Sequence, residues 1–260
     1  MTTTTPVIFA GAGPGDPDLI TIKAKQALEN ADLIIYAGSL VPEAVLCWKS
    51  STALTVSSAG MNLDEIISLI DDNYQKGKSI VRLHTGDPSL YGAIYEQMCL
   101  LDEKQISYTV IPGVTAAFGA SARLNMEYTL PEITQTLIFT RISGRTPVPE
   151  KESLERLAAH QASMAIYLSI SQIKKVEKII ETHYGKNAVC VIAYKVSHPE
   201  EMIIKTKACE LSTACETHNI TRHALIITGR AVEAACSRQN SIASKLYDAT
   251  FSHGYRNSDT

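Results

Sequence analysis

The chain has 260 residues, of which 45% are hydrophobic and 20% are charged, as is typical of a soluble globular protein. Its net charge of −3 argues against a protein that binds nucleic acid or anionic lipid over a basic surface. At roughly 100–200 residues per domain, this length predicts one large domain or two ordinary ones. No apolar run approaches the ~20 residues of a membrane span, so no membrane contact is expected.

The cysteines and histidines form no recognisable metal motif. The six cysteines include no C-x-x-C pair, and the seven histidines include no H-E-x-x-H pattern. We therefore expect no metal site, and thiols that are reduced and mostly buried. Residues 1–6 lack the basic and apolar regions of a secretory signal, so a cytoplasmic location is expected.

The first half of the chain alternates between strand-like and helix-like runs. Short apolar runs predict strands at 7–10, 33–36, 54–56, 79–83 and 108–111. Helical spacing of apolar residues predicts helices at 20–30, 62–75, 91–103 and 114–123. Asp18 or Thr21 is expected near the start of the first helix, and the second is expected to end before Gly77. Such alternation implies a mainly parallel sheet covered on both faces.

The composition changes near residues 125–132, which indicates a domain boundary. Beyond it we expect strands at 136–140, 164–168, 188–194, 202–206 and 224–228. Helices are expected at 152–160 and 171–184, and a loop rich in Gly, Pro and Arg at 141–150. The sequence thus predicts an α/β fold with domains at 1–122 and 123–236, followed by a polar tail at 237–260.

The loop Gly11–Asp16 (GAGPGD) follows the first strand and differs from a dinucleotide-binding fingerprint at its last position. That fingerprint needs glycine at the first, third and sixth positions, so that backbone can approach a pyrophosphate. Here the sixth position is Asp16, an anion where the phosphate would sit, and Pro14 removes one N–H donor. The pattern favours a sharp turn after a strand rather than a phosphate site.

Two further loops follow predicted strands, namely residues 84–92 (HTGDPSLYG) and residues 111–116 (IPGVTA). The carboxyl ends of parallel strands share one edge of the sheet, so all three loops should gather there, where ligands bind in open α/β sheets. Thr85–Tyr91 is interpreted as a tight turn that exposes backbone amides. Asp87 or Ser89 is then expected to cap the next helix.

Taken in order, these segments resemble the S-adenosylmethionine-dependent tetrapyrrole (corrin/porphyrin) methyltransferase family, and within it the precorrin-4 C(11)-methyltransferase branch of cobalamin biosynthesis. The resemblance covers almost the whole chain. The segments that carry it are 11–16, 36–40, 85–88, 112–116, 140–147, 167–169, 194–200, 221–225, 245–248 and 252–256.

The resemblance implies two α/β domains with mainly parallel or mixed sheets, a bound S-adenosylmethionine in the cleft between them, S-adenosylhomocysteine as product, and a homodimer. It places the cofactor contacts on Pro14, Gly86, Asp87, Tyr91, Thr115, Ala116, Leu168, Ala193, Tyr194, His223 and Ala224. The opening loop is expected to line the tetrapyrrole site through Gly13, Gly15 and Asp16.

The implied substrate carries many carboxylates, so cations are expected around it. Arg141 and Arg145, in the Gly/Pro loop, are the first candidates and Lys195 is a second. Related uroporphyrinogen-type enzymes carry an acidic residue after the strand tyrosine, whereas Tyr36 is followed here by Ala37. No acid/base pair is therefore carried over, and Tyr36 and Arg145 are the only catalytic candidates.

Three alternatives stay open. The acceptor is another tetrapyrrole carbon, or it is a macromolecule, as in the ribosomal-RNA and diphthine branches of the superfamily. The third alternative is a nucleotide-binding dehydrogenase. Asp16 argues against that alternative, and so does Tyr36-Ala37-Gly38, which stands where an acidic ribose contact would be needed.

Overall fold

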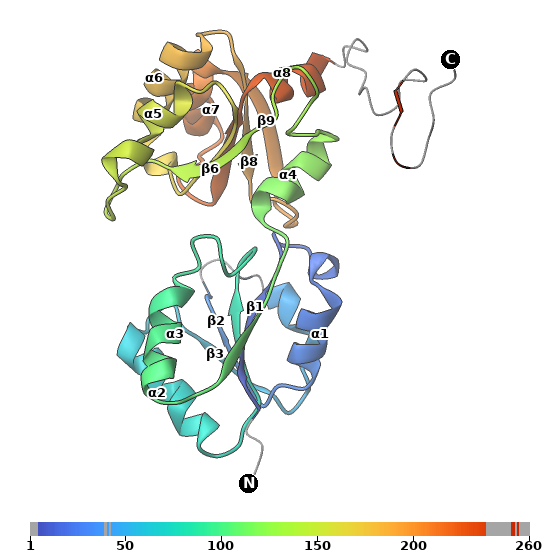
Figure 1. Cartoon of the computed structure of the whole chain (residues 1–260), viewed down its shortest axis with the longest axis vertical. Coiled ribbons are helices and arrows are strands. Elements are labelled where there is room, and N and C mark those ends of the chain that lie inside the picture. Colours follow the sequence, from blue (N-terminus) through green and yellow to red (C-terminus); the bar gives the residue numbers. More distant parts are fainter. Residues whose placement is uncertain (1–4, 39–40, 42, 238–250, 253, 255–260) are drawn as a thin grey trace. The chain divides into compact units, whose positions relative to one another are not determined.

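A computed structural model of the chain describes residues 5–38, 41, 43–237, 251, 252 and 254. They form two compact units (Figure 1). The first unit ends at Gly119 and also contains Lys195–Glu201, and the second contains Ala120–Tyr194 and the chain from Met202 onward. The predicted domains, 1–122 and 123–236, stay predictions. They place the segment 195–201 in the second domain, whereas it belongs to the first compact unit. Most of the predicted tail, 237–260, lies outside the described residues.

The first unit is built on a five-stranded parallel sheet, as predicted. The strands lie in the order β3-β2-β4-β1-β5, and every neighbouring pair is parallel. They are β1 Val7–Gly11, β2 Leu33–Tyr36, β3 Leu54–Ser57, β4 Ile80–His84 and β5 Tyr108–Ile111. The central strand β4 is buried throughout, which explains why its apolar run lacks the alternation of a half-exposed strand.

Helices cover both faces of this sheet. α1 (Ile22–Glu29) packs on one face through Ala24, Ala27 and Leu28. α2 (Leu63–Tyr74) and α3 (Ile94–Glu103) pack on the other, where Phe9, Ile70 and Leu101 share one apolar cluster (Figure 1). The short 3-10 turns η1 (Pro17–Leu19) and η2 (Glu43–Trp48) also belong to this unit, and α4 (Ala116–Leu124) contains Gly119, where the first unit ends.

The local sequence determines where two of these helices begin. Thr21 is the N-cap of α1 and accepts a hydrogen bond from Ala24 N, so Thr21 rather than Asp18 caps this helix. Asn62 and Glu65 form a reciprocal capping box at the start of α2. Both helices therefore start where side-chain oxygens satisfy their first free N–H groups.

The predicted start of α3 is wrong. The helix begins at Ile94 rather than near Tyr91, because Tyr91 and Ala93 have the left-handed φ values of 57° and 50°. A Cβ on Gly92 would collide with the Pro88 carbonyl. The segment before α3 is thus a tight irregular loop, and no side chain caps the helix.

The second unit contains a mixed five-stranded sheet in the order β6-β7-β10-β8-β9. β6 and β7 are parallel, whereas β10 is antiparallel to both of its neighbours and β9 is antiparallel to β8. The strands are β6 Leu137–Arg141, β7 Ser163–Tyr167, β8 Val189–Tyr194, β9 Met202–Lys207 and β10 Ala224–Thr228. The predicted fold class, two α/β parts with parallel or mixed sheets, is confirmed.

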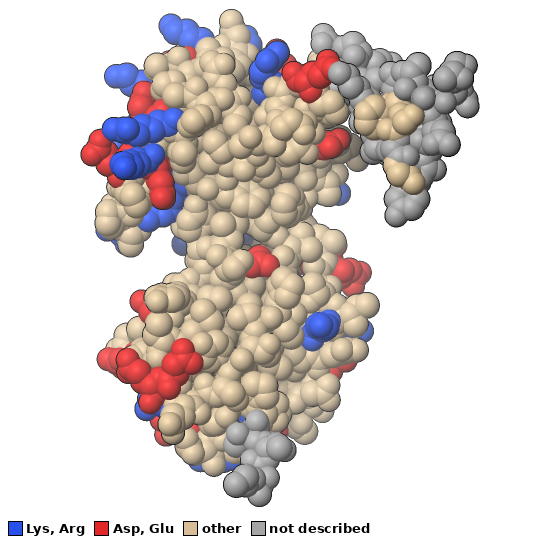
Figure 2. Space-filling view, viewed as in Figure 1, with Lys and Arg blue, Asp and Glu red and all other residues tan. Residues whose placement is uncertain are grey.

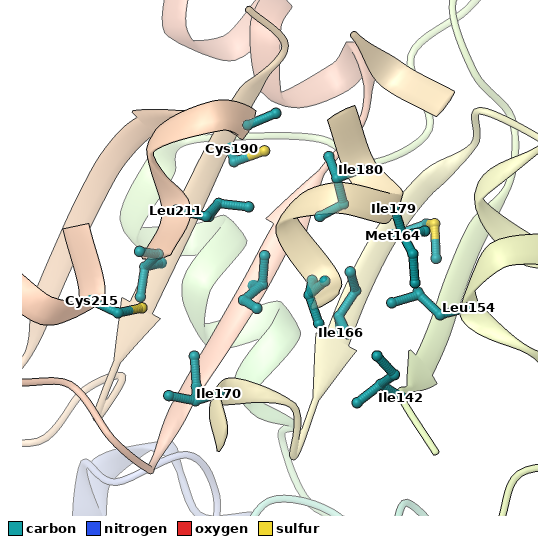
Figure 3. Packing of buried hydrophobic residues seen from close by; sticks show 14 of the residues in the cluster. Ile142, Leu154, Met164, Ile166, Ile170, Ile179, Ile180, Cys190, Leu211 and Cys215 are labelled. Atoms are coloured by element: carbon teal, nitrogen blue, oxygen red, sulfur yellow. The ribbon is translucent and has the colours of Figure 1, made fainter. Parts of the chain in front are cut away.

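Three helices bury one face of this second sheet. α5 (Leu154–Ala158), α6 (Ile173–Tyr184) and α7 (Leu211–Thr217) contribute to a single apolar cluster with the strands. Figure 3 shows Leu154 of α5, Ile180 of α6 and Leu211 of α7 in this cluster, together with Met164 and Ile166 of β7. α8 (Arg230–Ser237) follows β10 and buries Ala231 and Val232. The 3-10 turns η3 (Glu150–Glu152), η4 (Ile170–Gln172) and η5 (Ala208–Glu210) complete the unit.

Helices α7 and α8 were not predicted from the sequence. α7 is short and rich in Ser, Thr and Cys, and only Leu211 and Cys215 mark its buried face. These residue types are weak helix formers, so packing on the sheet supplies most of the stability of such a helix.

All six cysteines are free thiols. Cys190 and Cys215 are buried, Cys47 is exposed, and the other three are half-buried, so the expectation of mostly buried thiols holds for only two of them. None of the helices in the described chain is long and apolar enough to cross a membrane.

Candidate functional site

Three loops meet at the carboxyl edge of the first sheet, as the strand order predicts. Ala12 N donates to His84 O at 2.7 Å, and Gly13 and Gly86 pair through two backbone hydrogen bonds of 2.8 and 3.3 Å. Gly113 N donates to the Asp87 carboxylate at 2.9 Å. The opening loop, the 84–92 loop and the 111–116 loop are therefore bonded into one backbone platform.

Glycine is required at this platform because three backbones approach one another closely. A Cβ on Gly11 would lie 2.5 Å from Gly86 O and 2.6 Å from Gly113 Cα. Gly13 and Gly86 both have left-handed φ values, of 76° and 64°. The glycines of Gly11–Asp16 thus permit contact between protein loops, which supports the prediction that this is not a phosphate-binding loop.

Asp87 links two of the loops. One carboxylate oxygen accepts from Ser89 N at 2.8 Å and from Ser89 Oγ, and the other accepts from Gly113 N. Partial burial alone would raise the pKa of Asp87, but these three hydrogen bonds together lower it below its usual range. The prediction that Asp87 or Ser89 caps the next helix is wrong, because this carboxylate ties the 84–92 loop to Gly113 instead.

The segment Lys195–Glu201 packs against the opening loop inside the first unit. Ser197 Oγ accepts from Asp16 N at 2.8 Å, and a Cβ on Gly15 would strike the His198 ring. The Asp16 side chain accepts from Asp18 N and so caps η1. Ser197 and His198 were missed as site residues, although both lie in the YKVSHPE segment that carried part of the family resemblance.

Arg82 and His84 are two buried polar residues at the end of β4, where the 84–92 loop begins. Both side chains lie on the central strand β4 and are almost fully buried. Burial lowers the pKa of Arg82 to about 10, and burial together with the Arg82 charge lowers the pKa of His84 to about 3. Among the described residues, neither His84 Nε2 nor Thr85 Oγ1 has a hydrogen-bond partner. His84 is therefore neutral at physiological pH.

His84 should make the first unit sensitive to acid. Its pKa of about 3 in the folded protein lies below the unfolded value near 6.5, so the unfolded state takes up a proton that the folded state excludes. The free energy of unfolding should fall as pH drops from 6.5 toward 3, with a limiting contribution of about 1.4 kcal/mol per pH unit. Urea unfolding at several pH values measures this slope.

The His84→Gln variant should have a shallower slope than the wild type. The slope should not vanish, because burial also lowers the pKa of His198. An unchanged slope in His84→Gln would contradict the assignment.

The second unit gathers its candidates at one edge of its own sheet. Arg141 pairs with Tyr167 where β6 and β7 end, and Tyr194 pairs with Ala224 where β8 ends and β10 begins. Leu168 and His223 flank these strands with left-handed φ values of 51° and 57°. The Leu168 side chain is 65% exposed despite being apolar. Strained backbone of this kind is common at ligand sites.

The loop after β6 has two arginines with different surroundings. Arg141 donates from both terminal nitrogens to its own loop, at 3.0 Å to Thr146 O and 2.8 Å to Pro147 O. Gln172 also donates to Ser143 O at 2.8 Å. Arg145, at the tip of this braced loop, is exposed and makes no hydrogen bond or ion pair with the described residues. Of the two guanidinium groups, that of Arg145 is the one available to a ligand.

The remaining candidates occupy less open positions. Tyr36 ends β2 and packs on the apolar cluster under α1. Lys195 Nζ lies 3.7 Å from Glu200 Oε2. Trp48 donates to Pro17 O and lies under the Lys25 ammonium, 3.9 Å from the ring centroid, which supports a packing role for the tryptophan.

Charges are mixed on the surface drawn in Figure 2. Acidic side chains gather on the α2/α3 side of the first unit, and α2 alone carries Asp64, Glu65, Asp71 and Asp72. On the α5/α6 side of the second unit, lysines and arginines alternate with acidic residues. Within the described residues, no group of three His, Cys, Asp or Glu side chains is arranged to hold a metal ion.

The topology and the loop platform are those of a two-unit α/β enzyme, and the sequence comparison identifies its class. Residues 6–212 match the family Tetrapyrrole (Corrin/Porphyrin) Methylases. The chain belongs to this family.

Individual relatives agree with this assignment. A cobalt-precorrin-4 C(11)-methyltransferase of Methanocaldococcus jannaschii is 47% identical over 97% of this chain and 96% of its own length. The X-ray structure of a cobalamin biosynthetic cobalt-precorrin-4 methyltransferase is similar with a TM-score of 0.85 and 42% identity, covering 87% of this chain and 95% of that one.

A third comparison shows the fold alone. The uroporphyrin-III C-methyltransferase of Thermus thermophilus, complexed with S-adenosylhomocysteine, has a TM-score of 0.72 at 22% identity. The match covers 88% of this chain and 94% of that one.

Proposed function

We propose that this protein transfers a methyl group from S-adenosylmethionine to C-11 of precorrin-4 or of cobalt-precorrin-4, in the formation of the corrin ring. The observation that carries the proposal is the 47% identity, over nearly the full length, to a relative named for this reaction. The solved structure that is 42% identical is named as a cobalt-precorrin-4 methyltransferase.

The loop platform of the first unit fits a cofactor without phosphate groups. It contains the buried Thr85 hydroxyl, which can donate and accept and has no partner among the described residues. S-adenosylmethionine has amino, carboxylate and ribose groups that suit such donors and acceptors. We infer that Pro14, Gly86, Asp87, Tyr91, Thr115 and Ala116 form this part of the cofactor site, with Asp87 holding the loops in place.

The edge of the second sheet supplies the remaining inferred cofactor contacts. Leu168 exposes an apolar surface, and Tyr194 and Ala224 are neighbours across the β8–β10 pair. A flat adenine needs apolar contact and backbone hydrogen bonds, which strand ends provide. The proposed residues are Leu168, Ala193, Tyr194, His223 and Ala224.

Methyl transfer from a sulfonium requires alignment more than acid–base catalysis. S-adenosylmethionine supplies an already activated methyl group, and positioning alone contributes on the order of 7–11 kcal/mol to such reactions. The chain's own task is to fix the acceptor carbon in line with that methyl group and to exclude water. We assign no catalytic base, and Tyr36, packed at the end of β2, is proposed as a wall of the site.

We propose that Arg145 binds a carboxylate of the tetrapyrrole. Arg141 supports this role by bracing the loop, while Gly13, Gly15, Asp16 and Lys195 line the substrate site. Arg145→Ala should raise the KM for the tetrapyrrole by roughly tenfold, the loss of one charge-assisted hydrogen bond, and leave the affinity for S-adenosylmethionine unchanged. Steady-state kinetics with each substrate varied in turn measures this.

The matched control is Arg156→Ala, which removes an exposed arginine of the same unit that is paired with Glu150. Its kinetics should equal those of the wild type. Wild-type turnover by Arg145→Ala at low tetrapyrrole concentration would return Arg145 to the role of an ordinary surface cation.

The reaction itself is tested by product analysis. The protein is incubated with carbon-13 methyl-labelled S-adenosylmethionine and either precorrin-4 or cobalt-precorrin-4. Mass spectrometry should show one added methyl group, and carbon-13 NMR should place it on C-11. Methylation at a different ring carbon would favour the alternative that the enzyme acts on another carbon of the tetrapyrrole. Binding of NAD without binding of S-adenosylmethionine would favour a dehydrogenase.

We further propose, on the family resemblance, that the enzyme is a cytoplasmic homodimer. Sedimentation velocity of the purified full chain measures the assembly, and a monomer at micromolar concentration would contradict it.

A further inference from the structure

Arg82 is a buried cation without a buried anion. Its side chain is 5% exposed on the central strand β4, and among the described residues no carboxylate pairs with it. Its hydrogen bonds go from Nε to Gln97 Oε1 at 3.2 Å and from Nη1 to Ile35 O at 3.3 Å. Burying a charge with only neutral partners costs stability that an apolar side chain of similar size would not. Packing alone does not explain an arginine here.

Gln97 extends this contact to the main chain before α3. It is buried on α3, and its Nε2 donates to Ala93 O at 2.9 Å. A guanidinium only donates and a carbonyl only accepts, so the amide of Gln97 is held in one orientation between them. A continuous hydrogen-bonded path therefore runs from the central strand through Gln97 to Ala93.

The path ends on strained backbone. Ala93 and Tyr91 both have left-handed φ values, and Gly92 between them packs against Pro88 O. Each such residue costs free energy and keeps this conformation only where its surroundings impose it. The same stretch continues into Asp87 and Gly86, which form the loop platform.

We propose that Arg82 and Gln97 are positioning residues that hold the Ala93 carbonyl, and through it the 84–92 loop, in the geometry that binds the cofactor. Neither side chain needs to touch a ligand. Arg82 fixes the amide of Gln97 by a hydrogen bond from the sheet, and Gln97 in turn holds the loop by its hydrogen bond to Ala93 O. The inference rests on the proposed cofactor site.

The Gln97→Glu variant tests the hydrogen bond to Ala93 separately from the contact with Arg82. A carboxylate at position 97 still accepts from Arg82, now as an ion pair, but it has no N–H for Ala93 O. We expect thermal stability equal to or above that of the wild type, together with an affinity for S-adenosylmethionine that is weaker by about tenfold. Isothermal calorimetry gives the affinity, and hydrogen exchange of the amides of residues 86–93 should be faster than in the wild type.

Tyr74→Phe is the matched control, because it removes a hydrogen bond to Ser107 in the same unit. This bond does not involve the loop platform. It should bind S-adenosylmethionine as the wild type does. If Gln97→Glu does not fold, Gln97→Met, which fills a similar volume and also cannot donate to Ala93, replaces it in both measurements.

The outcomes distinguish this inference from the proposed function. Failure of the wild type to bind S-adenosylmethionine would overturn the proposed function, and the exchange rates would still test the anchorage. A wild type that binds, beside a Gln97→Glu variant that binds equally well with unchanged exchange at residues 86–93, would overturn the positioning role. Loss of affinity with slow exchange throughout would also contradict it, because the loop would then be held without Gln97.

Discussion

Gly11→Ala is expected to disrupt the loop platform and lower the stability of the first unit. The added methyl group would lie 2.5 Å from Gly86 O and 2.6 Å from Gly113 Cα, and neither backbone atom has a rotamer with which to move aside. Overpacking of this kind costs about 1–3 kcal/mol or more. Urea unfolding should show a lower free energy, and any folded fraction should bind S-adenosylmethionine much more weakly than the wild type.

Gly60→Ala provides the control for this substitution. A Cβ at Gly60 has nothing within 4 Å, so the exchange should be neutral or slightly stabilising through the unfolded state. Equal stability of the two alanine variants would show that the three loops separate easily, and the platform would then not be rigid.

Asp87→Asn is expected to weaken cofactor binding while the fold survives. The amide oxygen can still accept from Ser89, but the amide nitrogen would face the Gly113 N–H, so two donors would oppose each other. Leaving a partly buried N–H unsatisfied costs about 1–3 kcal/mol, which corresponds to roughly tenfold to hundredfold in affinity. Calorimetry with S-adenosylmethionine and circular dichroism of the same samples measure affinity and fold. Asp87→Ala should behave similarly.

Ser89→Ala distinguishes the two sides of this carboxylate. It removes only the hydroxyl contact to Asp87 and leaves Gly113 bonded, so a smaller loss of affinity is expected. Unchanged affinity in Asp87→Asn would remove Asp87 from the site altogether. A larger loss in Ser89→Ala than in Asp87→Asn would mean that the local turn, rather than the link to Gly113, shapes the site.

Much of the first unit was predictable because its elements are locally encoded. Strands β2 and β5 have the predicted bounds, and Asn62 with Glu65 marks the start of α2 through its own side chains. α3 was placed too early because Tyr91 and Ala93 adopt left-handed backbone that neither residue type favours. That conformation depends on the close packing of Gly92 against Pro88, which residue patterns do not reveal.

Some features of the candidate site were likewise predictable from the sequence, and others were not. Parallel strands must end at one edge, so the meeting of the three loops was predictable from the parallel direction of the strands. The contribution of Ser197 and His198 to the opening loop did not follow, because they lie far from it in the sequence. Arg141 and Arg145 were equivalent as sequence, and only the carbonyls of Thr146 and Pro147 distinguish them.

The sequence by itself determined the α/β class, the mainly parallel sheet of the first half and the family, because these depend on hydrophobic periodicity and on short motifs in a set order. Only the tertiary structure decided what the polar groups do. It directed Asp87 to Gly113, enclosed His84 as a neutral ring and buried Arg82 beside Gln97. Hydrogen-bond partners and burial are properties of three-dimensional packing between distant segments, so no local pattern specifies them.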